Sequence, residues 1–481
     1  MRVHFINVNQ DFDIAYFPNT KRFFKINSNG KKLIQLMSND ERIDSIMEQM
    51  NIDKDQYNQY YDLLAECNEA VCDKEDCNKD CNKECNKECN KSSDNKKILS
   101  RLVIHLTNDC NLRCKYCYAH GGKYLSERRK LNEEMLDKTI ERFYSEFDEI
   151  QFIQFFGGEP LLNMNLMEKA CEKIRSIDSE RKCTTHFGLV TNGTLINDRF
   201  INIVKKYGIE VTVSYDGYPL VNNLLRVFPN GEGTSDIILK NAKLLKEATG
   251  EPSTIEVTYT QYHIDNHISI MDVEKHIQKE LPDTYIHLVP AGGEDDSDLT
   301  VKDLDVFADS INDIFKECEN VKEGETVPSY SLADRIFLAI SHKEVKGSPY
   351  ICDAGIGTMS VAVDGNIYPC FMFTDQKDLL LGNIYDDDLF NSPKYRSIMD
   401  NIYKFSVKEN NSECKKCFIN TLCNGCLGLN SLQSGEVFKL NTKTCDMFRK
   451  MTDAALINFA KREEMVKAES KSESEEELIG V

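Results

Sequence analysis

Residues 99–325 alternate short apolar runs with segments in which apolar residues recur every three or four positions. Six apolar runs have the length and composition of buried strands: Leu102–Thr107, Phe152–Phe156, His186–Thr191, Glu210–Tyr215, Thr254–Tyr259 and Tyr285–Val289. Six amphipathic segments between and after them predict helices: Glu133–Phe147, Leu166–Ile177, Asp198–Lys206, Asp236–Glu247, Ile268–Lys279 and Leu304–Lys316. Strands that alternate with helices form parallel βαβ units. The pattern therefore predicts an α/β fold with six units, two fewer than a full TIM barrel.

Residues 1–65 have a different pattern, and we expect them to form a small α+β domain. Three aromatic-rich runs predict strands: Val3–Val8, Asp13–Phe17 and Arg22–Ile26. Three short amphipathic segments follow and predict helices: Gly30–Met37, Asp40–Met50 and Lys54–Leu64. Strands followed by short helices resemble a winged helix-turn-helix. The domain lacks a basic recognition helix, which argues against a DNA-reading role.

Residues 66–98 form a tract of Asn, Lys, Asp and Glu that contains six cysteines: Cys67, Cys72, Cys77, Cys81, Cys85 and Cys89. Without apolar residues this tract cannot bury a core, so its composition predicts a linker. If the tract is helical, a spacing of four residues places the thiols along one slowly drifting face. A solvated linker grown by repeat expansion and a metal-loading tract both fit this pattern.

Composition limits the number of domains, the class of binding partner and the cellular location that we expect. The chain has 481 residues, 41% of them hydrophobic, which is enough for two to four domains with buried cores. Its net charge of -20 makes it a poor partner for nucleic acids, because phosphate contacts need clusters of Lys and Arg. No apolar run reaches the roughly 18–20 residues that span a bilayer, and the start of the chain lacks a signal-peptide core. We therefore expect a cytoplasmic protein whose 19 cysteines are metal ligands or free thiols.

Three cysteines follow the first strand of residues 99–325 at spacings of four and three: Cys110, Cys114 and Cys117. A [4Fe–4S] cluster normally takes four cysteine thiolates. Three thiolates would leave one iron without a protein ligand and able to hold a substrate. A zinc site is the alternative, but zinc prefers paired Cys or His ligands that complete a tetrahedron. No such pair follows nearby in the sequence.

The spacing Cys-x3-Cys-x-aromatic-Cys after a first strand resembles the signature of the radical S-adenosylmethionine (SAM) enzymes. That resemblance implies a partial (β/α)6 barrel of the TIM type, with the active site at the carboxyl ends of the strands. It also implies that the open iron of the cluster on Cys110, Cys114 and Cys117 chelates the amino and carboxylate groups of SAM. The family's other motifs occur in order along the chain.

The resemblance assigns SAM-binding roles to residues that follow successive strands. Gly157-Gly158-Glu159-Pro160 matches the motif for the amino group of SAM, and glycines permit close approach of the backbone. Asn192 and Ser214 correspond to contacts with the ribose and the carboxylate, and Tyr116 to a position near the adenine. Arg226 matches an arginine that pairs with the SAM carboxylate, a role suited to a guanidinium.

Seven further cysteines lie between residues 326 and 450: Cys352, Cys370, Cys414, Cys417, Cys423, Cys426 and Cys445. Asp364-Gly365 between two apolar runs predicts a hairpin. The order of these cysteines resembles the SPASM extension, which binds two auxiliary [4Fe–4S] clusters. A zinc ribbon would use only the two Cys-x2-Cys pairs and would leave three cysteines unexplained.

The resemblance also allocates these cysteines between the two auxiliary clusters. Cys414, Cys417, Cys423 and Cys445 would bind one cluster, and Cys352, Cys370 and Cys426 the other. Some relatives supply a fourth ligand to the second cluster from a segment that corresponds to residues 353–360. Here that segment has no cysteine and places Thr358 at the most suggestive position. The second cluster is therefore predicted to keep an open iron for a substrate thiolate.

The resemblance implies a radical SAM/SPASM maturase of a ribosomally made, cysteine-rich precursor peptide. Residues 1–65 would bind the leader of that peptide, 66–98 would be the linker, 99–325 the barrel and 326–450 the SPASM domain. Residues 451–481 would be a helix from Asp453 and an acidic disordered tail. Because thioether-forming members act on peptides with repeated cysteines, the tract of residues 66–98 could also mimic the substrate.

The implied mechanism begins with an electron from a donor such as flavodoxin or ferredoxin. Cleavage of SAM yields a 5′-deoxyadenosyl radical, which abstracts hydrogen from a peptide carbon, and a cysteine thiolate then forms a thioether there. No general base is identifiable in the sequence. Alternatives are a sulfatase-type maturase that oxidises Cys or Ser, a maturase that forms carbon–carbon or carbon–oxygen links, and a non-catalytic iron–sulfur scaffold that binds peptide. The N-terminal domain and the absence of an eighth SPASM cysteine argue against the sulfatase type.

Overall fold

The computed structural model describes residues 2–9, 12–39, 41–68, 96–293, 297–321, 327–342 and 347–479, with side chains described through residue 462. The repeated cysteines from Cys72 to Cys89 lie outside these ranges, so the alternatives for that tract stay predictions.

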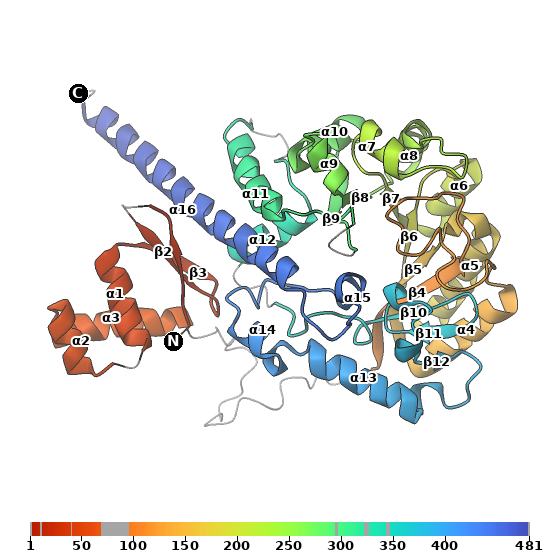
Figure 1. Ribbon diagram of the computed structural model, residues 1–481, viewed down its shortest axis with the longest axis horizontal. Helices are drawn as coiled ribbons and strands as arrows, with labels where there is room; N and C mark the ends of the chain where they lie inside the picture. The colour runs from red at the N-terminus through yellow and green to blue at the C-terminus, as the bar shows by residue number, and fades with distance from the viewer. Residues whose placement is uncertain are drawn as a thin grey trace.

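Six parallel strands form the barrel, and all six were predicted from the apolar runs. They are β4 (Ile98–Thr107), β5 (Glu149–Gly157), β6 (His186–Thr191), β7 (Ile209–Ser214), β8 (Thr254–Tyr259) and β9 (Tyr285–Pro290). The predicted helices are α4 (Glu133–Glu146), α5 (Met164–Arg181), α6 (Asp198–Tyr207), α8 (Ser235–Thr249), α10 (Ile270–Glu280) and α11 (Asp305–Cys318). These helices lie outside the strands in Figure 1. Their apolar faces share one core with the strands, which confirms the α/β partial barrel.

Short elements at the carboxyl ends of the strands complete the barrel. They are η1 (Pro160–Asn163) after β5, α7 (Pro219–Leu225) after β7 and α9 (Gln261–Asp265) after β8. Active sites of TIM-type barrels lie at this end. The SAM-binding residues predicted from motifs lie at the carboxyl ends of β5 and β7 or on segments that follow β4 to β7, so they meet at this rim.

The C-terminal domain extends the barrel sheet instead of standing apart from it. β10 (Thr358–Val361) pairs parallel with β4, and β11 (Asn366–Tyr368) and β12 (Gly382–Asn383) follow antiparallel. The hairpin was predicted, but its place beside β4 was not. The rest of the domain consists of η2 (Phe371–Phe373), η3 (Lys377–Leu379), η4 (Leu389–Asn391), α13 (Pro393–Ser406), η5 (Lys408–Asn410), α14 (Ser412–Lys416) and α15 (Leu427–Ser434). α12 (Ser331–Ser341) precedes it along β9.

The N-terminal domain has an antiparallel sheet of β1 (His4–Asn7), β2 (Asp13–Phe17) and β3 (Arg22–Ile26), covered by α1 (Ser28–Ser38), α2 (Ile43–Met50) and α3 (Lys54–Asn68). Alternation along β2 divides its side chains between two cores. Ala15 and Phe17 pack against the three helices. Ile14 and Tyr16 face the main core of the protein, so this domain is docked on the rest of the chain (Figure 1).

The C-terminal helix is longer than predicted. The sequence predicts a helix from Asp453 and a disordered tail after it, whereas α16 runs from Thr442 to Ile479. No Gly or Pro interrupts this segment, and its many Ala, Glu and Lys residues favour helix. In the described part of the chain, no helix has both the length and the apolar character needed to cross a bilayer.

Candidate functional site

The loop after β4 carries Cys110, Cys114 and Cys117 and is attached to the segment after α7. The backbone N–H groups of Arg113 and Lys115 donate to the carbonyls of Val227 (2.8 Å) and Leu225 (2.9 Å). The three thiols interact electrostatically, and burial raises the pKa of Cys110 to about 12. Buried thiols of this kind ionise only when a strong positive charge such as a metal binds them. The loop therefore fits an iron–sulfur cluster.

Two glycines let the turn after β5 pack against the cysteine loop. A Cβ on Gly157, whose φ is +131°, would overlap the carbonyl oxygen of Thr107. A Cβ on Gly158 would overlap the carbonyl oxygen of Asp109, the residue before Cys110. Close approach of two backbones therefore requires glycine at both positions.

Glu159 is a buried carboxylate that links the ends of β5 and β6. It accepts hydrogen bonds from Thr191 Oγ1 (2.7 Å), Asn192 N (2.8 Å) and Leu161 N (3.0 Å). Burial raises its pKa and these donors oppose the rise. A carboxylate has about four acceptor positions, so one remains for an amino group.

Asn192 connects this carboxylate to the cysteine loop. Its Nδ2 donates to Asn111 Oδ1 (2.9 Å) and points at Cys110 Sγ (3.8 Å). Amide donors to cluster sulfurs are a means by which proteins adjust cluster potentials. Asn111 is a site residue that the sequence reasoning did not select.

Arg226, Tyr116 and Asp216 form a second polar group at the rim. Arg226 Nη1 donates to Tyr116 Oη (2.7 Å), which donates to Asp216 (2.8 Å). Asp216 is fully buried, and burial raises its pKa while Arg226 lowers it. Arg226 is 7% exposed, and its Nε is buried without a partner. An unpaired guanidinium donor beside the cysteine loop suits a carboxylate ligand. The tyrosine expected near adenine thus holds its hydroxyl between Asp216 and Arg226.

A row of polar side chains crosses the inner face of the barrel. Strand register places Ser214 beside Glu256 and Glu256 beside His287. Their neighbours along each strand, such as Val213, Ile255 and Leu288, belong to the helix-covered core, so the row faces the opposite side. Burial lowers the pKa of His287, and Glu256 opposes that change. Sequence reasoning found no general base, because only strand register brings this histidine and this carboxylate together.

Cys352, Cys370 and Cys426 come together although consecutive members of the set are 18 and 56 positions apart in the sequence. Each of the three thiols interacts electrostatically with another member of the set. Thr358, at the position where a fourth ligand was considered, donates its hydroxyl to Asp353 (2.7 Å). Met372 Sδ lies 3.8 Å from Cys426 Sγ. The structure thus groups three thiols here, as the resemblance predicts.

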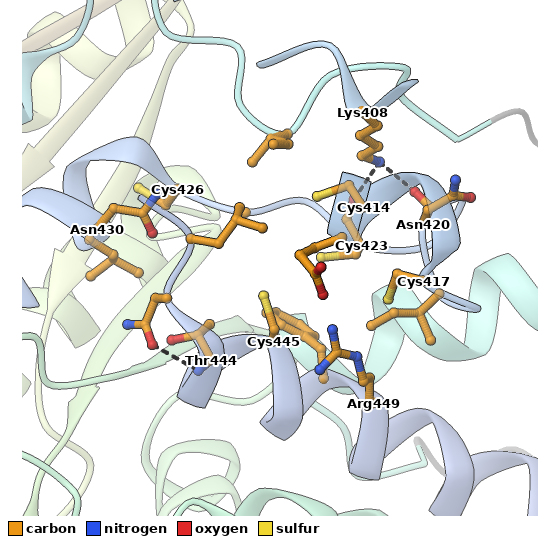
Figure 2. A pocket seen from close by; sticks show the side chains of 18 residues that line it. Lys408, Cys414, Cys417, Asn420, Cys423, Cys426, Asn430, Thr444, Cys445 and Arg449 are labelled. Carbon is orange, nitrogen blue, oxygen red and sulfur yellow. Dashed lines mark hydrogen bonds between the residues drawn. The ribbon is translucent and has the colours of Figure 1, made fainter. Parts of the chain in front are cut away.

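The remaining four cysteines of this domain, Cys414, Cys417, Cys423 and Cys445, line a pocket, and Figure 2 shows their sulfurs around it. Cys414 lies in α14, whose start is capped by Asn411 Oδ1 through the N–H groups of Glu413 (3.1 Å) and Cys414 (3.2 Å). Cys445 lies in the first turn of α16. Electrostatic interactions connect all four thiols.

Neither set of cysteines has the geometry of a single-ion site. Within the ranges that the structure describes, no three His, Cys, Asp or Glu side chains converge on a point where one metal ion could bind. A zinc ribbon needs such convergence. A cubane cluster needs wider spacing, because each thiolate binds a different iron.

Comparisons with known proteins agree with this site. A family model described as the radical SAM superfamily matches residues 104–279, and one described as SPASM, an iron–sulfur cluster-binding domain, matches residues 352–418. The Cysteine-type anaerobic sulfatase-maturating enzyme of Clostridium perfringens is 26% identical over 75% of this chain and 98% of its own length.

Two further proteins match this chain, one over about half of its own length and the other over almost all of it. Uncharacterized protein MJ0907 of Methanocaldococcus jannaschii is 36% identical over 31% of this chain, and the match spans about half (49%) of that protein. A solved structure, native anSMEcpe with bound AdoMet and Cp18Cys peptide, has a TM-score of 0.61 at 23% identity, covering 76% of this chain and 99% of that chain. This likeness shows the shared fold.

Proposed function

Because residues 104–279 match the radical SAM superfamily and residues 352–418 match the SPASM domain, we propose that this chain is a radical SAM enzyme that forms thioether crosslinks in a cysteine-containing precursor peptide. Bound at the barrel rim, SAM and its cluster supply the radical that removes hydrogen from a peptide carbon. The other steps depend on how the chain's own residues hold the cofactor, the peptide and the proton.

The observation that carries the proposal is the incomplete coordination at the barrel rim. Three partly buried thiols stand beside one free acceptor position on Glu159 and one unpaired donor on Arg226. This combination fits a three-cysteine cluster that binds the amino and carboxylate groups of SAM through its fourth iron. Asn192 and Asp216 position the same loop from β6 and β7.

The grouping of Cys352, Cys370 and Cys426 supports an auxiliary cluster with an open iron for the peptide thiolate. Because β10 joins β4, these thiols lie close to the barrel loop, and both Cys117 and Cys370 interact electrostatically with Tyr118. A peptide cysteine held there would face the barrel interior.

His287 is suited to receive the thiol proton. It stands on the inner face of β9 next to Glu256, and its lowered pKa keeps the imidazole neutral near pH 7. Its proposed role is to accept the proton at a ring nitrogen while Glu256 stabilises the imidazolium.

The N-terminal domain is proposed to bind the leader of the peptide. β1 and β3 are the edges of its sheet, and an extended leader can add to such an edge. The His4 ring stacks on Phe418 at 3.6 Å, and Arg2 donates to the carbonyl of Cys417. Leader binding would therefore take place on a domain that contacts the four-cysteine loop directly.

A sulfatase-type oxidation of a cysteine is the second candidate, favoured by the match to nearly the full length of a sulfatase-maturating enzyme. The two reactions leave different products. Thioether formation removes one H2 per crosslink and protects the cysteine from alkylation, whereas oxidation of the cysteine to an aldehyde creates a hydrazide-reactive group.

The test uses anaerobically reconstituted protein, SAM, a strong reductant and a candidate cysteine-rich precursor peptide. We expect mass loss of H2 and loss of alkylatable cysteine. The Cys183→Ala variant is the matched control, because Cys183 is a partly exposed thiol outside every cluster set and should leave the product unchanged. A hydrazide-reactive product would overturn the thioether proposal in favour of the second candidate. SAM cleavage with no change in this peptide would overturn its assignment as the substrate.

A further inference from the structure

Lys408 is a buried cation at the wall of the four-cysteine pocket. It is 5% exposed, and its Nζ donates to three backbone carbonyls, those of Ser348 (2.8 Å), Asn420 (2.5 Å) and Cys423 (2.7 Å). These bonds use all three of its donors. Among the described residues no carboxylate forms an ion pair with it. A buried charge without a counter-ion is costly, so its retention here calls for an anion nearby.

The anion that fits is a cluster on the adjacent thiols. Lys408 interacts electrostatically with Cys414, Cys417 and Cys423. Figure 2 shows its side chain reaching toward Cys414 and Cys423 from one side of the pocket. The lysine therefore contacts the loop that carries these cysteines directly, through the carbonyls of Asn420 and Cys423.

A second cation stands on the other side. Arg449 extends from α16, and its guanidinium interacts with Cys417 and Cys445 (Figure 2). It is partly exposed and also donates to Asp446 (2.5 Å). The carboxylates at this pocket, Asp446 and Glu413, are on its exposed rim. The charge of Lys408 is thus buried, that of Arg449 is partly exposed, and the negative charges are solvated.

We propose that Lys408 is a positioning residue that holds the loop of residues 420–423 and raises the reduction potential of the four-cysteine cluster, with a smaller contribution from Arg449. Four thiolates give the cluster a net negative charge, and reduction adds one more. A cation within the low-dielectric interior stabilises the reduced form more than the oxidised form. The buried ammonium is screened less than the half-exposed guanidinium. This inference rests on the proposed cluster at these cysteines.

The test is an anaerobic redox titration of the reconstituted full-length protein, followed by electron paramagnetic resonance. Lys408→Met should lower the midpoint of the four-cysteine cluster, and Arg449→Met should lower it less. Lys408→Arg should keep the midpoint close to that of the wild type. Lys415→Met is the control, because this exposed lysine lies between Cys414 and Cys417 in sequence but pairs with Glu409.

The outcomes separate this inference from the cluster assignment. Wild-type protein with zinc or no metal at these four cysteines would overturn the assignment itself. Full iron with an unchanged midpoint in Lys408→Met would overturn the role of its charge. If Lys408→Met loses iron, the midpoint potential of the four-cysteine cluster in Arg449→Met decides the question. A midpoint equal to that of the wild type overturns the electrostatic role of the two cations. A lower midpoint supports that role.

Discussion

The barrel rim and the four-cysteine pocket both gather partly buried thiols, yet their surroundings differ in charge. The rim has three thiols, two buried carboxylates, Glu159 and Asp216, and one arginine with a free donor. The pocket gathers Cys414, Cys417, Cys423 and Cys445 with a buried lysine and a second cation, and its carboxylates are exposed. Three thiols with spare polar groups suit a site that binds a small zwitterion. Four thiols with cations suit a closed site that stores an electron.

The difference also lies in how each site is built. The rim joins the ends of parallel strands, so hydrogen bonds from β6 and β7 fix its groups in place. The pocket is formed by loops and helix ends, and the Lys408 bonds hold those loops together. A substitution at the rim should therefore affect SAM binding, whereas one at the pocket should affect electron transfer.

Removing each set of cysteines is the most direct test of these separate roles, SAM binding at the rim and electron transfer at the pocket. Cys110/Cys114/Cys117→Ala should abolish 5′-deoxyadenosine formation and lower iron from about twelve per chain by about four. Cys414/Cys417→Ala should also lower iron by about four but keep SAM cleavage under strong reductant, while the peptide product is lost. Iron and sulfide analysis and chromatography measure these effects. SAM cleavage that survives in the first variant, or is lost in the second, would contradict these separate roles.

Gly158→Ala tests whether the rim depends on close backbone packing. The new methyl group would overlap the carbonyl oxygen of Asp109, so the cysteine loop must move. We expect loss of the rim iron with retention of the four-cysteine cluster. Gly208→Ala is the control, because Gly208 has a φ of +65° but open space around its Cβ position. It should cost only about 1 kcal/mol of stability. Full iron in Gly158→Ala would argue against this packing role.

Arg226→Lys tests the unpaired donor at the rim. Lysine keeps the positive charge but removes Nε and the planar fork. We expect SAM affinity to fall by about tenfold to a hundredfold, the equivalent of one charged hydrogen bond of about 1.5–3 kcal/mol. Calorimetric titration of the reconstituted protein measures this, and Arg199→Lys on the surface of α6 is the control. Unchanged affinity for SAM would remove Arg226 from the binding site.

A substitution at Glu274, which belongs to neither site, tests how a buried carboxylate affects the pH dependence of stability. It lies in α10 at 4% exposure, and burial raises its pKa from 4.5 to about 7. Between these values the folded protein binds more protons than the unfolded chain, so stability falls as pH rises through that window. Glu274→Gln should remove this dependence and stabilise the protein above pH 7 by about 1–3 kcal/mol.

Urea unfolding of the wild type and this variant at pH 5 and pH 8 measures the difference. Glu159→Gln provides the comparison, because Glu159 accepts three hydrogen bonds where it is buried. That substitution should destabilise the rim at both pH values. A gain in stability for both variants would mean that the rim carboxylate has no structural role.

Local patterns predicted most of the fold. Apolar runs and helical periodicity located β4 to β9 and the helices between them, because each element buries its own apolar face. Motif residues such as Glu159 and Ser214 were found because the ends of parallel strands meet at one rim. Cysteine spacing and family resemblance predicted the three groups of thiols that the structure brings together.

Tertiary structure alone decided which distant groups meet. No local pattern indicates that β10 pairs with β4, that His287 lies beside Glu256, or that Lys408 donates to Cys423. These contacts depend on strand register and on the docking of loops far apart in sequence, which periodicity does not encode. The sequence by itself thus determined the elements and the thiols available for clusters. The packing of those elements decided the charges around each group of thiols, because electrostatic interactions depend on distance in space and on burial.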